Sequence, residues 1–289
     1  MENSELLKKV RHIEIKTRGL SRNIFAGQYH SAFKGRGMAF SEVREYQYGD
    51  DVRDIDWNVT ARHNKPYIKV YEEERELTVM LLVDVSASRD FGAVGEFKRD
   101  MMAEIAATLA FSAIQNNDKI GVIFFTDRIE KFIPPKKGRK HILYIIRELI
   151  GFEPTGRGTD IGKVLEYATN AIKRRCTTFL ISDFIAPLNY SDALLIANRR
   201  HDVVALQVYD KRETMLPDVG LVKLRDAERG TERWVDTSSK RVRKSYADWW
   251  TQRQAAAVET CRKNRVDMTT VATDEDYVVA LMNLFKRRG

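Results

Sequence analysis

The chain has 289 residues, of which 43% are hydrophobic and 31% charged, and its 49 basic and 41 acidic residues give a formal charge of +8. This composition excludes a disordered protein and provides enough apolar material for one large domain or two small ones. Basic and acidic residues are interspersed, which favours a solvated surface over a nucleic-acid interface.

The first 77 residues are polar and glycine-containing, and they include the acid-rich stretch GDDVRDIDW. We expect a smaller β-rich N-terminal cassette that leans on the rest of the chain. A strand through VRDIDW would place Asp54 and Asp56 on one face. Charges such as Arg44 and Asp50 could pair in a structural clamp, and a docking surface for a partner is the alternative interpretation.

Beyond this cassette, segments with strand character alternate with segments with helical character. In EFKRDMMAEIAATLAFSAIQNN, for example, Phe97, Met101, Ile105 and Leu109 recur with the period of a buried helix. Apolar strands between amphipathic helices are typical of an α/β fold, with a mostly parallel sheet flanked by helices. We expect strands at 78–85, 119–126, 129–135, 177–184, 202–210 and 267–273, and helices at 96–117, 139–150, 160–173, 190–200 and 276–288.

Two segments interrupt the alternation near residues 219–265. The first, GLVKLRDAERGTERWVDT, has the pattern of a β-hairpin. The second, KRVRKSYADWWTQRQAAAVETCRKN, predicts a long helix with an apolar stripe that includes Trp249 and Trp250. We therefore divide the chain into a cassette, 1–77, and a sheet domain, 78–289, that carries this insertion.

The cysteines and the apolar runs indicate in which cellular compartment we expect the protein. Cys176 and Cys261 are far apart and form no C-x-x-C motif, so we expect no thiolate zinc site and a reducing, cytoplasmic environment. The N-terminus lacks the apolar core of a signal peptide. No apolar run approaches the roughly 18 residues of a membrane span, so we expect membrane contact only through partners.

Polar side chains follow the strands of the predicted sheet where a ligand would collect. Asp84, Ser86 and Ser88 follow the first strand of the sheet domain, Thr159 precedes a helix, and Asp183 ends another strand. The carboxyl ends of parallel strands meet at one edge of a sheet, where ligands bind in such folds. Carboxylate and hydroxyl oxygens suit Mg²⁺, with Mn²⁺ or Ca²⁺ as substitutes. The alternative is that the serines cap the next helix and Asp84 accepts backbone N–H bonds.

The pattern D-x-S-x-S at Asp84, Ser86 and Ser88, with Thr159 and Asp183 in order behind it, resembles the metal-ion-dependent adhesion site of von Willebrand factor type A domains. The resemblance implies that these five residues hold a metal ion, directly or through water. It also implies that a protein ligand donates a carboxylate to the vacant position on the metal.

A second resemblance covers more of the chain. The stretch GRGMAFSEVREYQYGDDVRDIDWNVTAR, followed by EEERELTVMLLVDVSAS, is similar to a bacterial family of unknown function numbered fifty-eight. The resemblance implies a MoxR-type AAA+ ATPase as partner, a chaperone-like role on a client protein, and no enzymatic activity.

Enzymatic alternatives fare less well. The sequence has no P-loop, no H-E-x-x-H and no G-x-S-x-G motif. We therefore predict a non-enzymatic, metal-dependent protein-binding adaptor. A metal-dependent phosphoesterase or nuclease, in which the cation activates water, is one alternative, and a scaffold with a non-functional metal site is the other.

Overall fold

The computed structural model describes residues 10–17, 38–63, 65–73, 77–93, 96–228 and 230–288. Contacts divide the chain into two compact units, one of Lys34–Leu77 and one that joins Met1–Phe33 to Thr78–Gly289. The larger unit includes a helix over residues 10–17. These residues fall within the predicted cassette, 1–77, but in the structure they belong to the sheet unit. That helix buries Val10 and Ile13, and its Lys16 forms a 2.6 Å ion pair with Glu104.

The smaller unit is built on an antiparallel pair of strands, β1 (Met38–Glu45) and β2 (Tyr67–Glu73). The predicted strand through VRDIDW is wrong: this stretch forms a 3₁₀ helix, η2 (Val52–Asp54), and the start of helix α3 (Trp57–His63). The aspartates explain the difference, because Asp51 accepts the N–H of Arg53 and Asp56 accepts the N–H of Asn58. Such local bonds compete with strand pairing.

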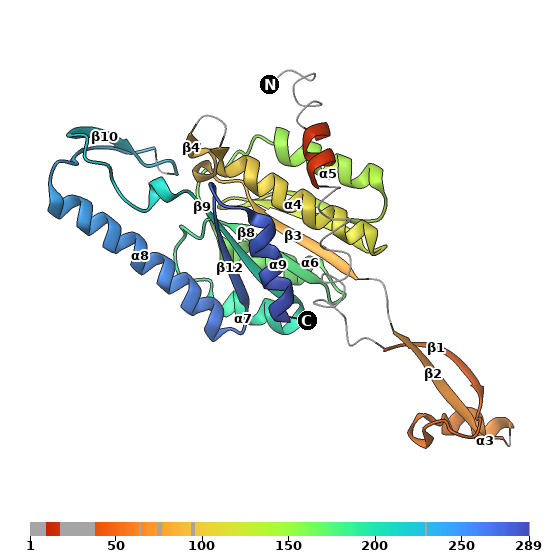
Figure 1. The fold of residues 1–289 in the computed structure, drawn as a ribbon. Helices are drawn as coiled ribbons and strands as arrows, with labels where there is room; N and C mark the ends of the chain where they lie inside the picture. Colours follow the sequence, from red (N-terminus) through yellow and green to blue (C-terminus); the bar gives the residue numbers. More distant parts are fainter. Residues whose placement is uncertain are drawn as a thin grey trace. The chain divides into compact units, whose positions relative to one another are not determined.

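The larger unit contains a six-stranded sheet of order β12-β9-β8-β3-β6-β7 (Figure 1). Every pairing in it is parallel except that of β6 with β7, which confirms the predicted mostly parallel sheet. Strand β7 lies at one edge and contains Pro134 and Pro135. The strands are β3 (Thr78–Asp84), β6 (Lys119–Phe125), β7 (Ile129–Lys136), β8 (Thr177–Ser182), β9 (Asp202–Tyr209) and β12 (Asp267–Ala272).

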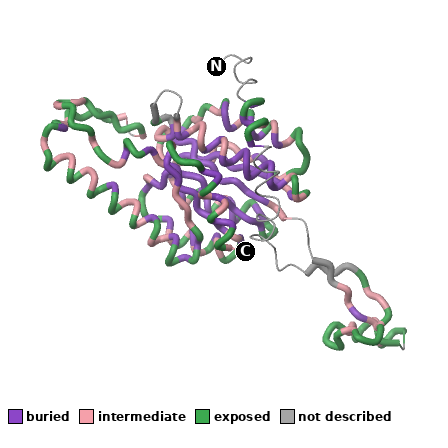
Figure 2. The backbone as a smooth tube through the Cα atoms, viewed as in Figure 1, coloured by how far each residue is buried: buried purple, intermediate pink, exposed green. Residues whose placement is uncertain are grey.

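Helices cover both faces of this sheet (Figure 1), and its four central strands, β9, β8, β3 and β6, are almost wholly buried (Figure 2). Helix α4 begins at Lys98, so its buried face carries Lys98, Met102 and Ile105, whereas Phe97 and Met101 of the predicted stripe are only half-buried. The helices on one face are α4 (Lys98–Gln115), α5 (Arg139–Gly151) and α9 (Tyr277–Arg288), and those on the other are α6 (Ile161–Ala171), α7 (Ser191–Arg200) and α8 (Lys240–Lys263).

The predicted insertion is present as hairpin β10–β11, with strands Leu221–Arg225 and Glu232–Asp236, followed by α8. Trp250 is buried, but Trp249 is 42% exposed and contacts Tyr246, so the predicted packing of both indoles holds for only one. Short elements complete the fold, namely η3 (Ala87–Asp90), β4 (Gly92–Ala93), β5 (Glu96–Phe97) and η4 (Lys211–Glu213). Among the described residues, we find no helix with both the length and the apolar character of a membrane span.

Candidate metal centre

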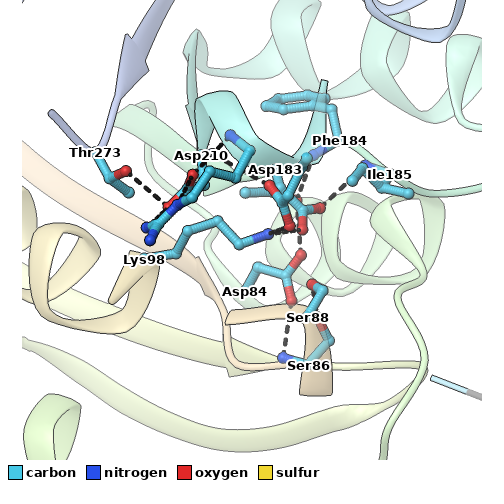
Figure 3. A network of polar contacts seen from close by, with 12 residues as sticks. Asp84, Ser86, Ser88, Lys98, Asp183, Phe184, Ile185, Asp210 and Thr273 are labelled. Carbon is cyan, nitrogen blue, oxygen red and sulfur yellow. Dashed lines mark hydrogen bonds and ion pairs between the residues drawn. The ribbon is translucent and has the colours of Figure 1, made fainter. Parts of the chain in front are cut away.

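Neighbouring parallel strands bring the two predicted acids to the same edge of the sheet. β3 ends at Asp84 and β8 ends at Ser182, and the two strands pair with Val83 opposite Ile181. Asp183 follows directly. The Ser182 hydroxyl donates a 2.6 Å hydrogen bond to Asp84 Oδ2, which ties the two strand ends together. Figure 3 shows the two acids, Asp84 and Asp183, side by side at this edge.

The turn after β3 gathers the two serines beside these acids. Asp84 Oδ1 accepts the N–H of Ser86 at 2.9 Å, as the capping alternative expected of this acid. Ser86 stands at the N-cap of η3 but makes no side-chain capping bond. Its hydroxyl lies 3.0 Å from that of Ser88, and Ser88 is close enough to Asp183 to lower the pKa of that acid. Four of the five predicted residues therefore meet in one cluster.

Thr159, the fifth residue, lies in the loop before α6. Asp160 caps that helix by accepting the N–H of Lys163 at 2.9 Å, and Ala87 N–H reaches Arg157 O at 3.1 Å, which fastens the loop to the serine turn. The Thr159 hydroxyl donates a 2.8 Å hydrogen bond to Glu228, a residue of the β10–β11 hairpin. The Thr159 side chain thus bonds to the hairpin and not to the other four residues.

Lys98 is a member of this cluster that sequence reasoning missed. Its side chain is fully buried, and its ammonium donates to Asp183 Oδ2 at 2.9 Å and to Glu213 Oε1 at 2.6 Å. Glu213 is held by a capping box in which Asp210 is the reciprocal partner. The helical period places Lys98 one turn before Met102 on the buried face of α4, but it does not show the distant acids with which the lysine pairs.

The charged groups of the cluster are not equally balanced by opposite charges and hydrogen bonds. Burial raises the pKa of Asp84 to about 6, and the negative charge of Asp183 adds to the rise. Burial also acts on Asp183, but the charge of Lys98 and the hydrogen bonds from Ile185 N–H and Ser88 hold its pKa below the ordinary value. The pKa of Lys98 is lowered by burial and raised more strongly by Asp183 and Glu213, so the lysine stays charged at neutral pH.

The two glutamates at this edge, Glu228 and Glu213, are also not fully balanced by positive charge, and both have a raised pKa. Burial raises the pKa of Glu228 to about 7, the charges of Asp183 and Asp84 add to it, and the Thr159 hydrogen bond opposes it. Burial raises the pKa of Glu213 against the opposing charge of Lys98. The edge therefore carries more acidic groups than its lysine neutralises.

The donor chemistry fits a hard cation that uses hydroxyl ligands. Within the described part of the chain, no three side chains of the His, Cys, Asp and Glu types converge closely enough to hold a metal ion by themselves. A cation at this edge would therefore take oxygens from Ser86, Ser88 and Thr159 as well as from Asp84 and Asp183. Such oxygen donors are those that Mg²⁺ and Ca²⁺ take in proteins.

Comparison with known sequences gives a consistent family. The family model described as "Protein of unknown function DUF58" matches residues 42–256. The uncharacterized protein Rv1480 of Mycobacterium tuberculosis is 30% identical over 293 residues, which cover 100% of this chain and 92% of that protein. The uncharacterized protein Mb1516 of Mycobacterium bovis matches with the same identity and coverage.

Comparison with solved structures concerns the fold. An aerotolerance-related membrane protein from Bacteroides fragilis aligns with a TM-score of 0.50 and 16% identity, covering 73% of this chain and 98% of that one. The VWA domain of SpRpn10 aligns with a TM-score of 0.36 and 9% identity, covering 73% and 94%. The predicted α/β fold, a mostly parallel sheet flanked by helices, is confirmed by the sheet order and by the first of these likenesses.

Proposed function

The chain belongs to the protein family of unknown function DUF58, and from this premise we propose that it is a non-enzymatic adaptor that binds proteins through a divalent cation. The cation is Mg²⁺, for which Mn²⁺ or Ca²⁺ can substitute. The partners are a MoxR-type AAA+ ATPase and a client protein, in the cytoplasm, and nucleic acid is not among them.

The observation that carries this proposal is the convergence of Asp84, Ser86, Ser88 and Asp183 at the carboxyl edge of the sheet. With Thr159, these residues would hold the cation. Hydroxyl ligands are neutral, so the cation keeps much of its charge and attracts an incoming carboxylate. An acidic side chain of the partner is therefore the group that this site would recruit.

A second candidate function, a scaffold that binds partners without metal, is favoured by Lys98. Its ammonium already contacts Asp183 and Glu213, and so supplies part of the positive charge that a cation would bring. In that case the cluster would be a structural ion network, and partner binding would be independent of Mg²⁺.

The test is calorimetry of the purified chain with a MoxR-type ATPase encoded in the same genome, in Mg²⁺ and in chelator. We expect binding in Mg²⁺ alone, its loss in Asp84→Asn, and its retention in the control Asp192→Asn, which removes an exposed acid at the start of α7.

If the affinity for the ATPase is unchanged both by the chelator and by Asp84→Asn, the scaffold is supported instead. A parallel assay with a generic phosphodiester substrate tests the hydrolase alternative, and Mg²⁺-dependent turnover that disappears in Asp183→Asn would replace the adaptor with an enzyme.

A further inference from the structure

The β10–β11 hairpin is attached to the sheet unit by little of its own surface. Within the described part of the chain its two strands pair only with each other, and of their side chains only Val222 and Val235 are half-buried. Trp234 and Leu221 are 66% and 63% exposed. Packing of the strands therefore does not explain where the hairpin lies, because apolar burial is the main stabiliser of such contacts.

Hydrogen bonds and an ion pair hold the base of the hairpin. Thr237 is fully buried and donates both its N–H and its hydroxyl to Gly220 O, at 2.8 and 2.7 Å. Gly220 has a φ of 82°, in the left-handed region that favours glycine. Arg243 of α8 also holds this base, because it donates to Thr237 O and forms a 2.9 Å ion pair with Asp218.

The tip of the hairpin reaches the candidate metal centre through one residue. The tip is closed by hydrogen bonds from Gly230 N–H to Asp226 O at 2.8 Å and from Glu228 N–H to Asp226 Oδ1 at 3.0 Å. Glu228 is half-buried, and its Oε1 accepts the 2.8 Å bond from Thr159. A methyl group on Gly158 would lie 3.9 Å from its other carboxylate oxygen, so the carboxylate rests against this loop.

The negative charge of this carboxylate is unfavourable at this place. Asp84 and Asp183 are close enough for their charges to act on Glu228. Like charges at such range repel, and a shared cation turns that repulsion into attraction. A hydroxyl has one donor and two lone pairs, so Thr159 can donate to Glu228 while it presents a lone pair to a cation.

From this geometry we infer that Glu228 is a built-in acidic ligand of the metal centre, which holds the place that a partner's carboxylate would take. The inference rests on the proposed function for the presence of the cation. It adds that the Glu228 carboxylate competes with the partner's carboxylate for the cation, so the partner has to displace it. Displacement would break the Thr159–Glu228 hydrogen bond and separate the tip of the hairpin from the Thr159 loop. The partner chemistry that fits is an acidic side chain on a protein surface.

The experiment is Mg²⁺ titration calorimetry on the full chain, combined with amide hydrogen exchange of the hairpin peptide in the absence and presence of Mg²⁺. Three proteins are compared: the wild type, Glu228→Gln, and the control Glu232→Gln. The control removes the same charge from the same hairpin, where Glu232 pairs with Lys223 rather than with Thr159.

We expect the Mg²⁺ dissociation constant to rise about tenfold in Glu228→Gln, in line with the loss of other supporting groups at metal sites, and to change less than twofold in the control. We also expect Mg²⁺ to slow exchange of the hairpin in the wild type but not in Glu228→Gln.

An unchanged Mg²⁺ affinity in Glu228→Gln, or a wild-type hairpin whose exchange ignores Mg²⁺, would overturn the inference and leave the metal-dependent adaptor standing. A wild-type chain that binds no Mg²⁺ would overturn both together.

Discussion

Lys98→Met is the substitution whose effect on stability follows most directly from the structure. The lysine is fully buried, and its partners Asp183 and Glu213 have side chains that are 1% and 10% exposed. Methionine fills a similar volume but leaves two buried carboxylates without their cation. Breaking a buried ion pair by removing one partner costs about 3–5 kcal/mol. Because a domain has about 5–15 kcal/mol of stability in all, the loss should be severe but should not prevent folding of a well-stabilised domain.

Urea unfolding followed by circular dichroism, at constant m-value, measures this loss. We expect Lys98→Met to lower the free energy of unfolding by about 3–5 kcal/mol at pH 7. The double variant Lys98→Met/Glu213→Gln should recover part of that loss, because one of the stranded charges is gone. A single variant within about 1 kcal/mol of the wild type, or a double variant less stable than the single, would refute the account of Lys98 as the counter-charge of this cluster.

Three further outcomes test other parts of the structure. Burial lowers the pKa of His201 to about 4, so its neutral form is favoured in the folded state. The free energy of unfolding should therefore be highest above pH 6.5 and should fall by up to roughly 3 kcal/mol as the pH is lowered toward 4. In urea titrations across this range, His201→Gln should reduce this dependence on pH. In Gly121→Ala, the new methyl group would meet Ile133 O at 2.8 Å, so the melting temperature should fall by an amount equivalent to about 1–3 kcal/mol; an unchanged melting temperature would contradict the close approach of β6 and β7. MgCl₂ should raise the melting temperature of the wild type but not of Asp84→Asn, and equal shifts would argue for non-specific binding.

The candidate centre shows which site residues a sequence can reveal. Asp84 and Asp183 were predictable because each follows a continuous apolar run, and the ends of parallel strands meet at one edge. The serines were predictable because alternate positions in one turn point to a common place. These four residues could be predicted from a local sequence pattern and a general rule of sheet geometry. Neither the pattern nor the rule requires knowledge of the tertiary packing.

The remaining members of the centre depend on packing that the sequence does not display. Lys98 was overlooked because lysine is almost never fully buried unless it is paired, and its pairs lie 85 and 115 residues away along the chain. Glu228 sits in a hairpin whose pattern predicts its own strands but not the place where its tip comes to rest. In the cassette, Asp51 and Asp56 form local turns whose hydrogen bonds overrode the alternation read as a strand.

The edge strand β7 has a consequence for behaviour at high concentration. A row of free backbone donors at a sheet edge is a template on which another chain can add a strand, and this is how many folded proteins begin to aggregate. Pro134 and Pro135 carry no N–H, so neither residue can donate from this edge to an added strand. Replacing both prolines with valine should leave the monomer folded but promote self-association, because it would restore the missing donors and add β-forming side chains in the same place.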